Sequence, residues 1–253
     1  MIKLFRNIRQ NLLNDGKTGK YLKYAIGEII LVVIGILIAL QINNWNEARK
    51  ASIEEKTVLE SLFVNLELSK KQSETLISEE VALKNRLISV LGFDTIQSKN
   101  ITEEITDSIF QNAVWDLQSD LPTFNAYNNL KNTNKLSLIK DKKINEKFAD
   151  LEFHLNRLTD LLEDRLNVHQ IRIDNIMEKD INFIPLIKSN FPKINFENET
   201  PNNYSQILKD KRIRNLIGMK LTFTQDVITY RENLDKEIKE LILLINEEIN
   251  RRA

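Results

Sequence analysis

The chain contains no cysteine, only two histidines, six glycines and four prolines among its 253 residues. The absence of cysteine excludes disulfide bonds, thiolate metal sites and a cysteine nucleophile. Scarce glycine and proline argue against collagen-like, all-β and glycine-loop α/β architectures. The 36 basic and 36 acidic side chains cancel, so the overall charge gives no reason to expect nucleic acid as a partner. What remains, 42% hydrophobic and 28% charged residues, is the composition of a folded protein.

Motifs that carry chemistry are missing as well. The two histidines, His154 and His169, form no HExxH or His-x-x-x-His pair, and the sequence has no glycine-rich phosphate loop, GxSxG elbow or kinase motif set. Adjacent acids are interpreted as exposed helix charges; these are Glu54-Glu55, Glu79-Glu80 and Glu103-Glu104. We therefore expect no catalytic residue, no cofactor and no metal site, and we do not expect an enzyme.

One long apolar run stands out against this background. The stretch Ala25 to Ile42 holds a single charge, Glu28, and at 1.5 Å per residue it is about 27 Å long, enough for a hydrocarbon core of about 30 Å. No small-x-small cleavage site follows it, which favours an uncleaved anchor over a signal peptide. We predict a transmembrane helix over residues 25–43; a buried core helix is the alternative.

The flanking charges predict the orientation of this anchor. Six basic residues and one acid, Asp15, precede residue 25, so the N-terminus is expected in the cytoplasm and residues 44–253 outside. The exported part then carries a net charge of about −4 and has no electrostatic attraction to nucleic acid. Residues 1–24 form a basic cytoplasmic segment, in which residues 1–14 are read equally well as an interfacial amphipathic helix or as a frayed tail.

Small residues recur on one side of the anchor. Gly27, Gly35 and Ala39 have the spacing that lets two membrane helices approach closely, although small residues are also common in such helices for other reasons. Glu28 lies about one turn from the cytoplasmic edge, close enough to reach the interface, so an ion or proton role is the less favoured reading.

The anchor and its flanks also carry a resemblance. The string from Gly27 to Glu47, GEIILVVIGILIALQINNWNE, with the basic FRNIR stretch and GKTGKY before it, resembles an uncharacterised family of membrane-anchored helical proteins abundant in Bacteroidetes, classed as a domain of unknown function. The resemblance extends more weakly to residues 124–139, where relatives usually carry a glycine near Asn134. It implies a Gram-negative inner membrane and a periplasmic domain, and it implies no activity, cofactor or catalytic residue.

Beyond the anchor, apolar residues recur at steps of three and four, which is typical of amphipathic helices. We predict a long helix over about 45–91 ended by Gly92, shorter helices over about 101–136, a long helix over about 141–184, a Pro- and Asn-rich loop over 185–203 and a long helix over about 204–251. Amphipathic helices with short connections pack most simply as an antiparallel bundle. The predicted class is therefore all-α, with one N-terminal transmembrane helix followed by a long-helix bundle or coiled-coil-like domain outside the membrane.

The clearest apolar seam lies in the helix over 141–184. It consists of Ile144, Phe148, Leu151, Leu155, Leu158 and Leu162, then continues through Arg165, His169, Ile173 and Ile176. Arg165 interrupts the seam, and Leu166 is expected to turn inward in its place. His169 is expected as a hydrogen-bonded seam residue rather than a ligand, and Arg165 with His169 forms a candidate polar seam.

Two short motifs suggest modification. Asp94-Thr95-Ile96 and Asp107-Ser108-Ile109 resemble the sequon of periplasmic O-glycosylation in Bacteroidetes, with Thr95 and Ser108 as the acceptors. The alternative is helix capping, because Asp, Ser and Thr favour helix starts.

Two functions remain open. The first is a non-enzymatic, membrane-anchored interaction or scaffold protein that binds another envelope protein or itself, with the lipid bilayer as its other partner. The alternative is a ligand-sensing bundle that signals through a partner membrane protein. A polar pocket near Arg165 and His169 would favour sensing, whereas a dry apolar seam would remove it.

Overall fold

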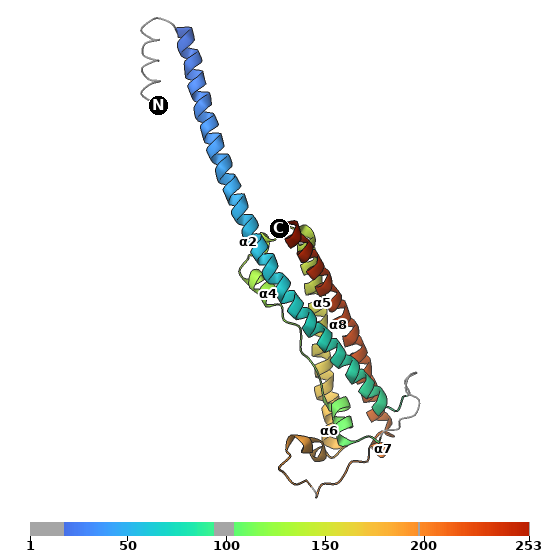
Figure 1. The fold of residues 1–253 in the computed structure, drawn as a ribbon. Coiled ribbons are helices and arrows are strands. Elements are labelled where there is room, and N and C mark those ends of the chain that lie inside the picture. Colours follow the sequence, from blue (N-terminus) through green and yellow to red (C-terminus); the bar gives the residue numbers. More distant parts are fainter. Residues whose placement is uncertain (1–17, 94–103, 197, 253) are drawn as a thin grey trace. The chain divides into compact units, whose positions relative to one another are not determined.

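The computed structural model describes residues 18–93, 104–196 and 198–252, and every regular element within them is helical (Figure 1). The all-α prediction is therefore confirmed. The chain divides into two compact units, Met1–Thr57 (unit 1) and Val58–Ala253 (unit 2).

Unit 1 contains the first part of helix α2, Thr18–Val90. This helix includes a stretch, starting at Ala25, that is long and apolar enough to cross a membrane or to act as a signal sequence, and none of that stretch is buried. Side chains from Ile29 to Lys50 are all exposed. The predicted interfacial helix over residues 1–14 lies outside the described residues.

Unit 2 is built from the part of α2 that follows Thr57 and from two further long helices, α5 and α8, which pack along each other (Figure 1). Shorter elements connect them. In chain order the elements after α2 are α3 (Asp107–Phe110), the π-helical turn η1 (Gln111–Trp115), α4 (Asn125–Asn132), the 3-10 turn η2 (Leu136–Leu138), α5 (Lys142–Val168), the π-helical turn η3 (His169–Ile173), α6 (Asp174–Lys179), the 3-10 helix η4 (Ile184–Asn190), α7 (Tyr204–Ile207) and α8 (Lys211–Arg251).

Capping residues set the ends of the long helices. Asp141 and Asp210 each accept hydrogen bonds from two backbone N–H groups of the helix that follows, at 2.8 and 3.1 Å before α5 and at 2.7 and 3.2 Å before α8. The cap at Asp210 is the reason α8 starts at Lys211 rather than near residue 204. α2 ends at Val90, and Gly92, with φ +70°, closes its last turn because Phe93 N–H donates to Ile88 O at 3.1 Å.

Two further boundaries differ from the sequence prediction. The helix expected over 141–184 ends at Lys179 and contains the π-helical turn η3. The stretch expected as a loop over 185–203 begins with η4, which Pro185 enters at its first turn, where its fixed φ is tolerated.

A left-handed residue closes α4. Asn134 has φ +56°, and it is placed by two bonds: Lys135 N–H donates to Leu130 O at 2.8 Å and Asn134 N–H donates to Lys131 O at 3.2 Å. This is the helix-ending arrangement that usually requires glycine, and asparagine is the residue that tolerates it next best. The turn therefore forms here without the glycine that the resembling family usually carries near this position.

This turn supports a prediction about stability. Asn134→Gly is expected to stabilise unit 2 by about 0.5 kcal/mol, because glycine removes the strain of positive φ at some cost in unfolded-chain entropy. Asn128→Gly, at an exposed position inside α4, is the matched control and is expected to destabilise by a similar amount. Urea unfolding of the detergent-purified chain measures both; two changes of the same sign would contradict the prediction.

Unit 2 has two apolar cores. Core 1 is formed by α2, α4, α5 and α8 and includes Leu62, Phe148 and Ile238, with the rings of Tyr127 and Phe148 stacked at a centroid distance of 4.4 Å. Core 2 is formed by the end of α2, α3, η1, η3, α6, η4, α7 and the start of α8, and includes Leu87, Leu186 and Ile217. Along α2, α5 and α8 alike, buried polar and charged residues lie between the two cores.

Candidate functional site: a charged layer between two cores

The polar boundary between the cores is formed by four buried charged side chains, which we call the charged layer. Glu80 comes from α2, Arg165 from α5, and Lys220 and Arg231 from α8. All four are at least 95% buried, with Glu80 completely so. Charged residues are almost never this buried unless they are paired, so the arrangement of the layer is specific.

Glu80 is the centre of the layer. Its two carboxylate oxygens accept hydrogen bonds from both terminal nitrogens of Arg165, at 2.8 and 2.9 Å, in a bidentate pair. Arg231 approaches the same carboxylate from α8, with Nη2 3.5 Å from Oε1. One buried carboxylate thus joins α2 to both other long helices. Bidentate pairs of this kind fix geometry as well as charge.

The remaining donors of the layer bind main-chain carbonyls at the end of η1 and in residues 116–124, the connecting segment between η1 and α4. Lys220 Nζ donates to Val114 O at 2.7 Å and to Asp116 O at 2.6 Å, Arg165 Nη2 donates to Gln118 O, and Arg231 Nη1 donates to Asp120 O at 2.9 Å. The three acceptors in the connecting segment, Asp116, Gln118 and Asp120, are alternate residues, as expected for an extended chain whose successive carbonyls point to opposite sides. The buried cations therefore clamp an extended segment onto the helices.

Polar side chains of α2 continue this clamp toward α4. Ser69 Oγ donates to Thr123 O at 2.6 Å, Gln72 Oε1 accepts from Thr123 N–H at 2.9 Å, and Asn65 Oδ1 accepts from Ala126 N–H at 3.2 Å. These residues share one face of α2 because they recur at helical spacing. The end of the connecting segment near α4 thus obtains hydrogen-bond partners from this face of α2.

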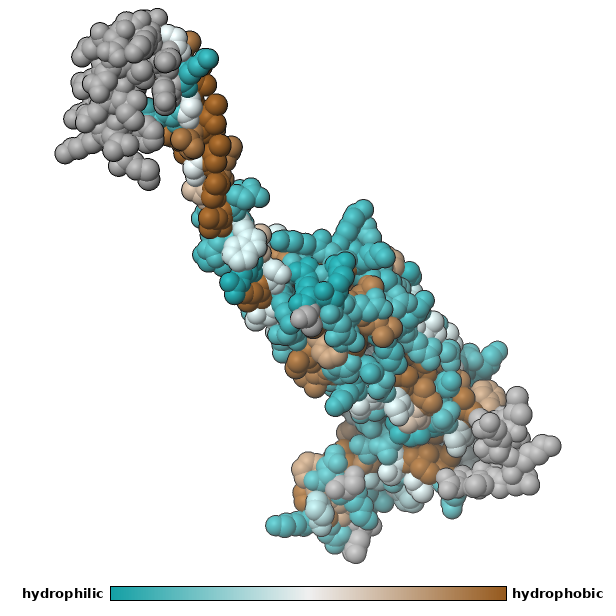
Figure 2. Space-filling model, turned by 45° about the horizontal axis from the view of Figure 1, so that its top comes forward, coloured by the Kyte–Doolittle hydropathy of each residue, from teal (hydrophilic) through white to brown (hydrophobic). Residues whose placement is uncertain are grey.

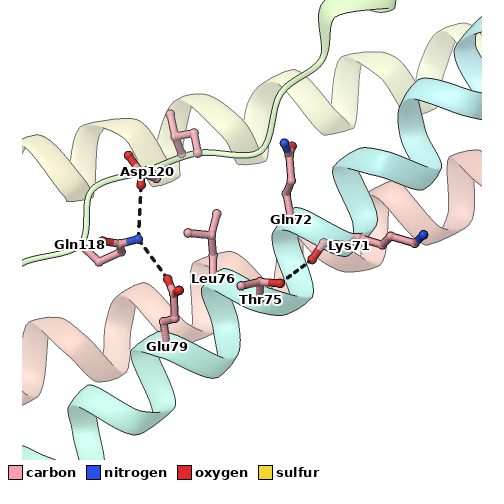
Figure 3. Close-up of a pocket in the computed structure, with 8 residues that line it drawn as sticks. Lys71, Gln72, Thr75, Leu76, Glu79, Gln118 and Asp120 are labelled. Carbon is pink, nitrogen blue, oxygen red and sulfur yellow. Dashed lines mark hydrogen bonds between the residues drawn. The ribbon is translucent and has the colours of Figure 1, made fainter.

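An open groove of about 490 Å³ runs between α2 and the connecting segment (Figure 3). The Gln118 amide nitrogen lies between two carboxylates, 3.0 Å from Glu79 Oε2 and 3.3 Å from Asp120 Oδ2. Thr75 points along the helix and donates to Lys71 O at 3.0 Å. The groove is open to solvent, and its walls combine polar side chains with the apolar Leu76 and Leu121.

A much smaller hollow lies on another side of the layer. It has a volume of about 10 Å³ and is lined by Arg165, His169 and Lys220 together with apolar side chains such as Leu216 and Phe223. A space of this size accepts about one water molecule. Burial, with the nearby positive charges of Lys220 and Arg165, lowers the pKa of His169 to about 4, so this imidazole is neutral at pH 7.

The titration of Lys220 is shifted in the same way. Burial is the main cause that lowers its pKa to about 7, and Arg165 and Arg86 add to the shift, whereas the carboxylates of Asp116 and Glu80 oppose it. Keeping Lys220 protonated therefore costs free energy in folded unit 2, and this cost is absent from the unfolded chain.

A pH dependence of stability follows. Between pH 7 and about 10.5 the unfolded chain keeps the Lys220 proton that the folded chain loses, so stability rises with pH in this window, by about 2 kcal/mol between pH 7 and 9. Lys220→Met is expected to flatten this rise, and Lys236→Met, at an exposed position of α8, is expected to keep it. Thermal unfolding at pH 7, 8 and 9 measures the slope; an unchanged slope in Lys220→Met would contradict the assignment.

The structure brings the two residues of the predicted polar seam, Arg165 and His169, to one place, but it corrects two expectations around them. Leu166 does not turn inward: it is 37% exposed, whereas Arg165 is buried because Glu80 and Gln118 O provide acceptors for it. Glu80 is not an exposed helix charge. Adjacent helix residues point about 100° apart, so when α2 packs, Glu79 stays exposed and Glu80 is buried. Glu55 is buried in the same way.

The other predicted site residues lie away from the layer. Gly35 and Ala39 are in the exposed stretch of unit 1, and Gly27, just before it, is half-buried. A Cβ built on either glycine meets no atom within 4 Å. Thr95 lies outside the described residues. Ser108 is exposed at the start of α3, whose N-cap is Thr106; the neighbouring Asp107 instead accepts hydrogen bonds from Tyr204 and Asn202. Within residues 18–93, 104–196 and 198–252, no group of three or more His, Asp or Glu side chains is arranged to hold a metal ion.

Comparison with known proteins gives one match. Residues 28–114 match the model of DUF6090, described as a family of unknown function. The matched region begins in the apolar stretch of α2 and ends in η1, so it includes Glu80, whereas Arg165, Lys220 and Arg231 lie beyond it. This match supports the resemblance to an uncharacterised family. Searches of curated proteins and of solved structures found no match.

Proposed function

We propose that this protein is a non-enzymatic interaction or scaffold protein anchored by a single helix in the inner membrane of a Gram-negative bacterium, with unit 2 in the periplasm. The observation that carries the proposal is the stretch of α2 after Ala25, which is apolar, helical and not buried by any described residue. In water such a surface is unfavourable by about 25 cal/mol for each Å² of apolar area, whereas the hydrocarbon core of a bilayer removes this cost.

The orientation in this proposal rests on charge. The positive residues cluster before the apolar stretch, and segments rich in Lys and Arg stay on the cytoplasmic side. Unit 2 contains 27 basic and 31 acidic side chains, a balance suited to a protein partner or to a second copy rather than to nucleic acid. The family resemblance is the support for placing the protein in Bacteroidetes.

The charged layer supports a structural rather than a catalytic role. Its cations donate to Glu80 and to the carbonyl oxygens of the connecting segment, and the enclosed hollow beside them has room for about one water. Reactive groups of an enzyme would instead be aimed at a cavity large enough for a substrate. In this proposal the layer fixes how the three long helices pack and so preserves the outer surface that a partner recognises.

Crosslinking in intact cells tests the proposal. A photoreactive residue at exposed positions of unit 2, such as Val64 on α2 and Leu243 on α8, is expected to give a discrete higher-mass species at one of them or at a neighbouring exposed site. The control is a strain that expresses the wild-type chain, which carries no photoreactive residue. Recovery of the uncoupled monomer alone from a scan of the exposed face of all three helices would contradict the proposal.

The second candidate is a ligand-sensing bundle that acts through a partner membrane protein, with its site at the hollow lined by Arg165, His169 and Lys220. That hollow has room for about one water, so a ligand would have to move the surrounding helices apart. In that case a small polar compound would raise the melting temperature of the wild-type chain and fail to raise that of Lys220→Met. Equal shifts in the two chains would remove the hollow as the sensing site.

A further inference from the structure

The buried charges of the charged layer do not balance. On the face shown in Figure 2, most residues of unit 2 are hydrophilic, and charges at such a surface are solvated and screened. The charged layer is different because its four side chains are buried. Glu80 contributes one negative charge, against three positive charges from Arg165, Lys220 and Arg231. With Lys220 protonated, the layer therefore holds two positive charges that no buried carboxylate within it neutralises.

Carboxylates around the layer do not cancel this excess. Asp116 and Asp120 are exposed, and the side chain of Asp174, whose Oδ1 is 3.7 Å from His169 Nε2, is 41% exposed. Solvent weakens the interaction of such carboxylates with a buried cation. The next buried acid along α8, Asp235, is already paired with a lysine at 2.6 Å.

The titration of Lys220 agrees with this charge count. Burial and the positive charge of Arg165 lower its pKa to about 7, although Asp116 and Glu80 oppose the shift. The ammonium group thus lies where further negative charge would stabilise it.

Some polar groups of the layer are also left without partners. Nε of Arg165 and Nδ1 of His169 are buried and have no hydrogen-bond partner among the described residues. Lys220 has three N–H groups and uses two of them, for the carbonyl oxygens of Val114 and Asp116. A buried donor without an acceptor is unfavourable, so a small acceptor beside these groups would be stabilising.

The side chains that carry these groups line one hollow, the space of about 10 Å³ beside the layer. The charged residues that line it are Arg165, Arg172 and Lys220, and no carboxylate is among the described residues of its walls. Apolar side chains such as Leu216 complete the walls and keep the local dielectric constant low, which strengthens the attraction of an anion. Arg172 is exposed, so the hollow lies close enough to solvent for an ion to enter.

We infer that this hollow binds one monatomic anion, such as chloride or bromide. A space that accepts about one water suits a halide ion, which is only slightly larger, whereas sulfate, phosphate and organic acids are too large for it. A halide accepts hydrogen bonds from any direction. It therefore suits Arg165 Nε, the ammonium group of Lys220, and His169 in the tautomer that carries its proton on Nδ1. A water molecule could bind the same donors but would leave the buried charge in place, and it is the alternative that the test distinguishes.

Thermal unfolding of the full, detergent-purified chain tests the inference. The melting temperature is measured at pH 6.5, below the pKa of Lys220, in about 0.15 M sodium gluconate and in sodium chloride or bromide of the same concentration. Gluconate keeps the ionic strength equal and is too large for the hollow. We expect the wild-type chain to melt about 3–6 °C higher in either halide, which is the shift for an ion at about ten times its Kd.

Two variants locate this effect. Val168→Leu adds a methylene group to the wall of the hollow and keeps every charge of the layer, and Lys220→Met removes one cation. Each is expected to lose at least two thirds of the halide shift. The matched controls are Val64→Leu and Lys236→Met at exposed positions of α2 and α8, and both are expected to keep it. If Lys220→Met does not fold, Val168→Leu alone decides.

Two outcomes would overturn the inference. Equal halide shifts in the wild-type chain and in Val168→Leu would show that halides act on the protein surface in general. No shift in the wild-type chain would leave the hollow to water. The inference does not depend on the proposed anchor or partner, because the hollow, both variants and their controls lie in unit 2.

Discussion

Replacing Glu80 with leucine is expected to lower the free energy of unfolding of unit 2 by about 3–5 kcal/mol, because the change leaves Arg165 and Arg231 buried without their carboxylate. Both guanidinium groups are 98% buried, and Nε of each already has no hydrogen-bond partner among the described residues. An uncompensated buried charge is one of the few single-residue causes of so large an effect. For a unit of this size the melting temperature is expected to fall by about 6–20 °C.

The neighbouring residue provides the control. Glu79→Leu changes the adjacent acid in the same way, but Glu79 is exposed and accepts a hydrogen bond from the exposed Gln118 amide, so an effect of less than about 1 kcal/mol is expected. Thermal unfolding of the detergent-purified chains at pH 7 compares the two. Equal losses in Glu79→Leu and Glu80→Leu would show that the charged layer does not contribute specifically to stability.

The second large effect concerns the apolar stretch of unit 1. Placing lysine at both Val33 and Leu37 is expected to disfavour membrane insertion by about 5–7 kcal/mol, since each charge near the centre of a membrane helix costs about 2.5–3.5 kcal/mol. The two positions are one turn apart and both exposed. The variant is therefore expected to leave the membrane pellet on extraction with alkaline carbonate, or to be degraded, whereas the wild-type chain stays in the pellet.

A matched pair lies further along the same helix. Val64 and Leu68 have the same spacing and are exposed, but they belong to unit 2. Lysine at both positions is expected to leave the chain in the pellet, because these residues are outside the predicted span. Release of both double variants, or of neither, would contradict the assignment of the membrane segment.

The sequence is a good guide to the apolar faces of the long helices. Ile144, Phe148, Leu151, Leu158 and Leu162 were predicted as a seam of the helix over 141–184, and all are buried in core 1. Such residues recur at the helical period, and their burial can be predicted without knowing which residues they contact, because any apolar neighbour is suitable. The start of α5 was predicted to within a residue, whereas the start of α8 was predicted near 204 and lies at Lys211, because the cap at Asp210 is recognised only when the N–H groups that it binds are known.

The charged layer shows what the sequence could not provide. Arg165 falls on the seam, and the usual cost of burying an arginine favoured Leu166 in its place. The outcome reverses because Glu80, 85 residues earlier, and a main-chain carbonyl of the connecting segment lie within reach. A main-chain acceptor leaves no trace in the amino-acid sequence. One sequence pattern could have indicated a polar contact face on α2. Asn65, Ser69 and Gln72 recur there at helical spacing, before Glu80 in the sequence.

The chain is proposed to cross the membrane once with unit 2 outside the cytoplasm, and protease accessibility of a C-terminal epitope tests this topology most directly. Spheroplasts that express the full chain with an epitope after Ala253 are treated with protease, with a cytoplasmic protein as the control for lysis. We predict that protease removes the epitope from the membrane-bound chain in intact spheroplasts, while the cytoplasmic control protein survives. An epitope that stays protected until the spheroplasts are lysed would place unit 2 in the cytoplasm and contradict the account.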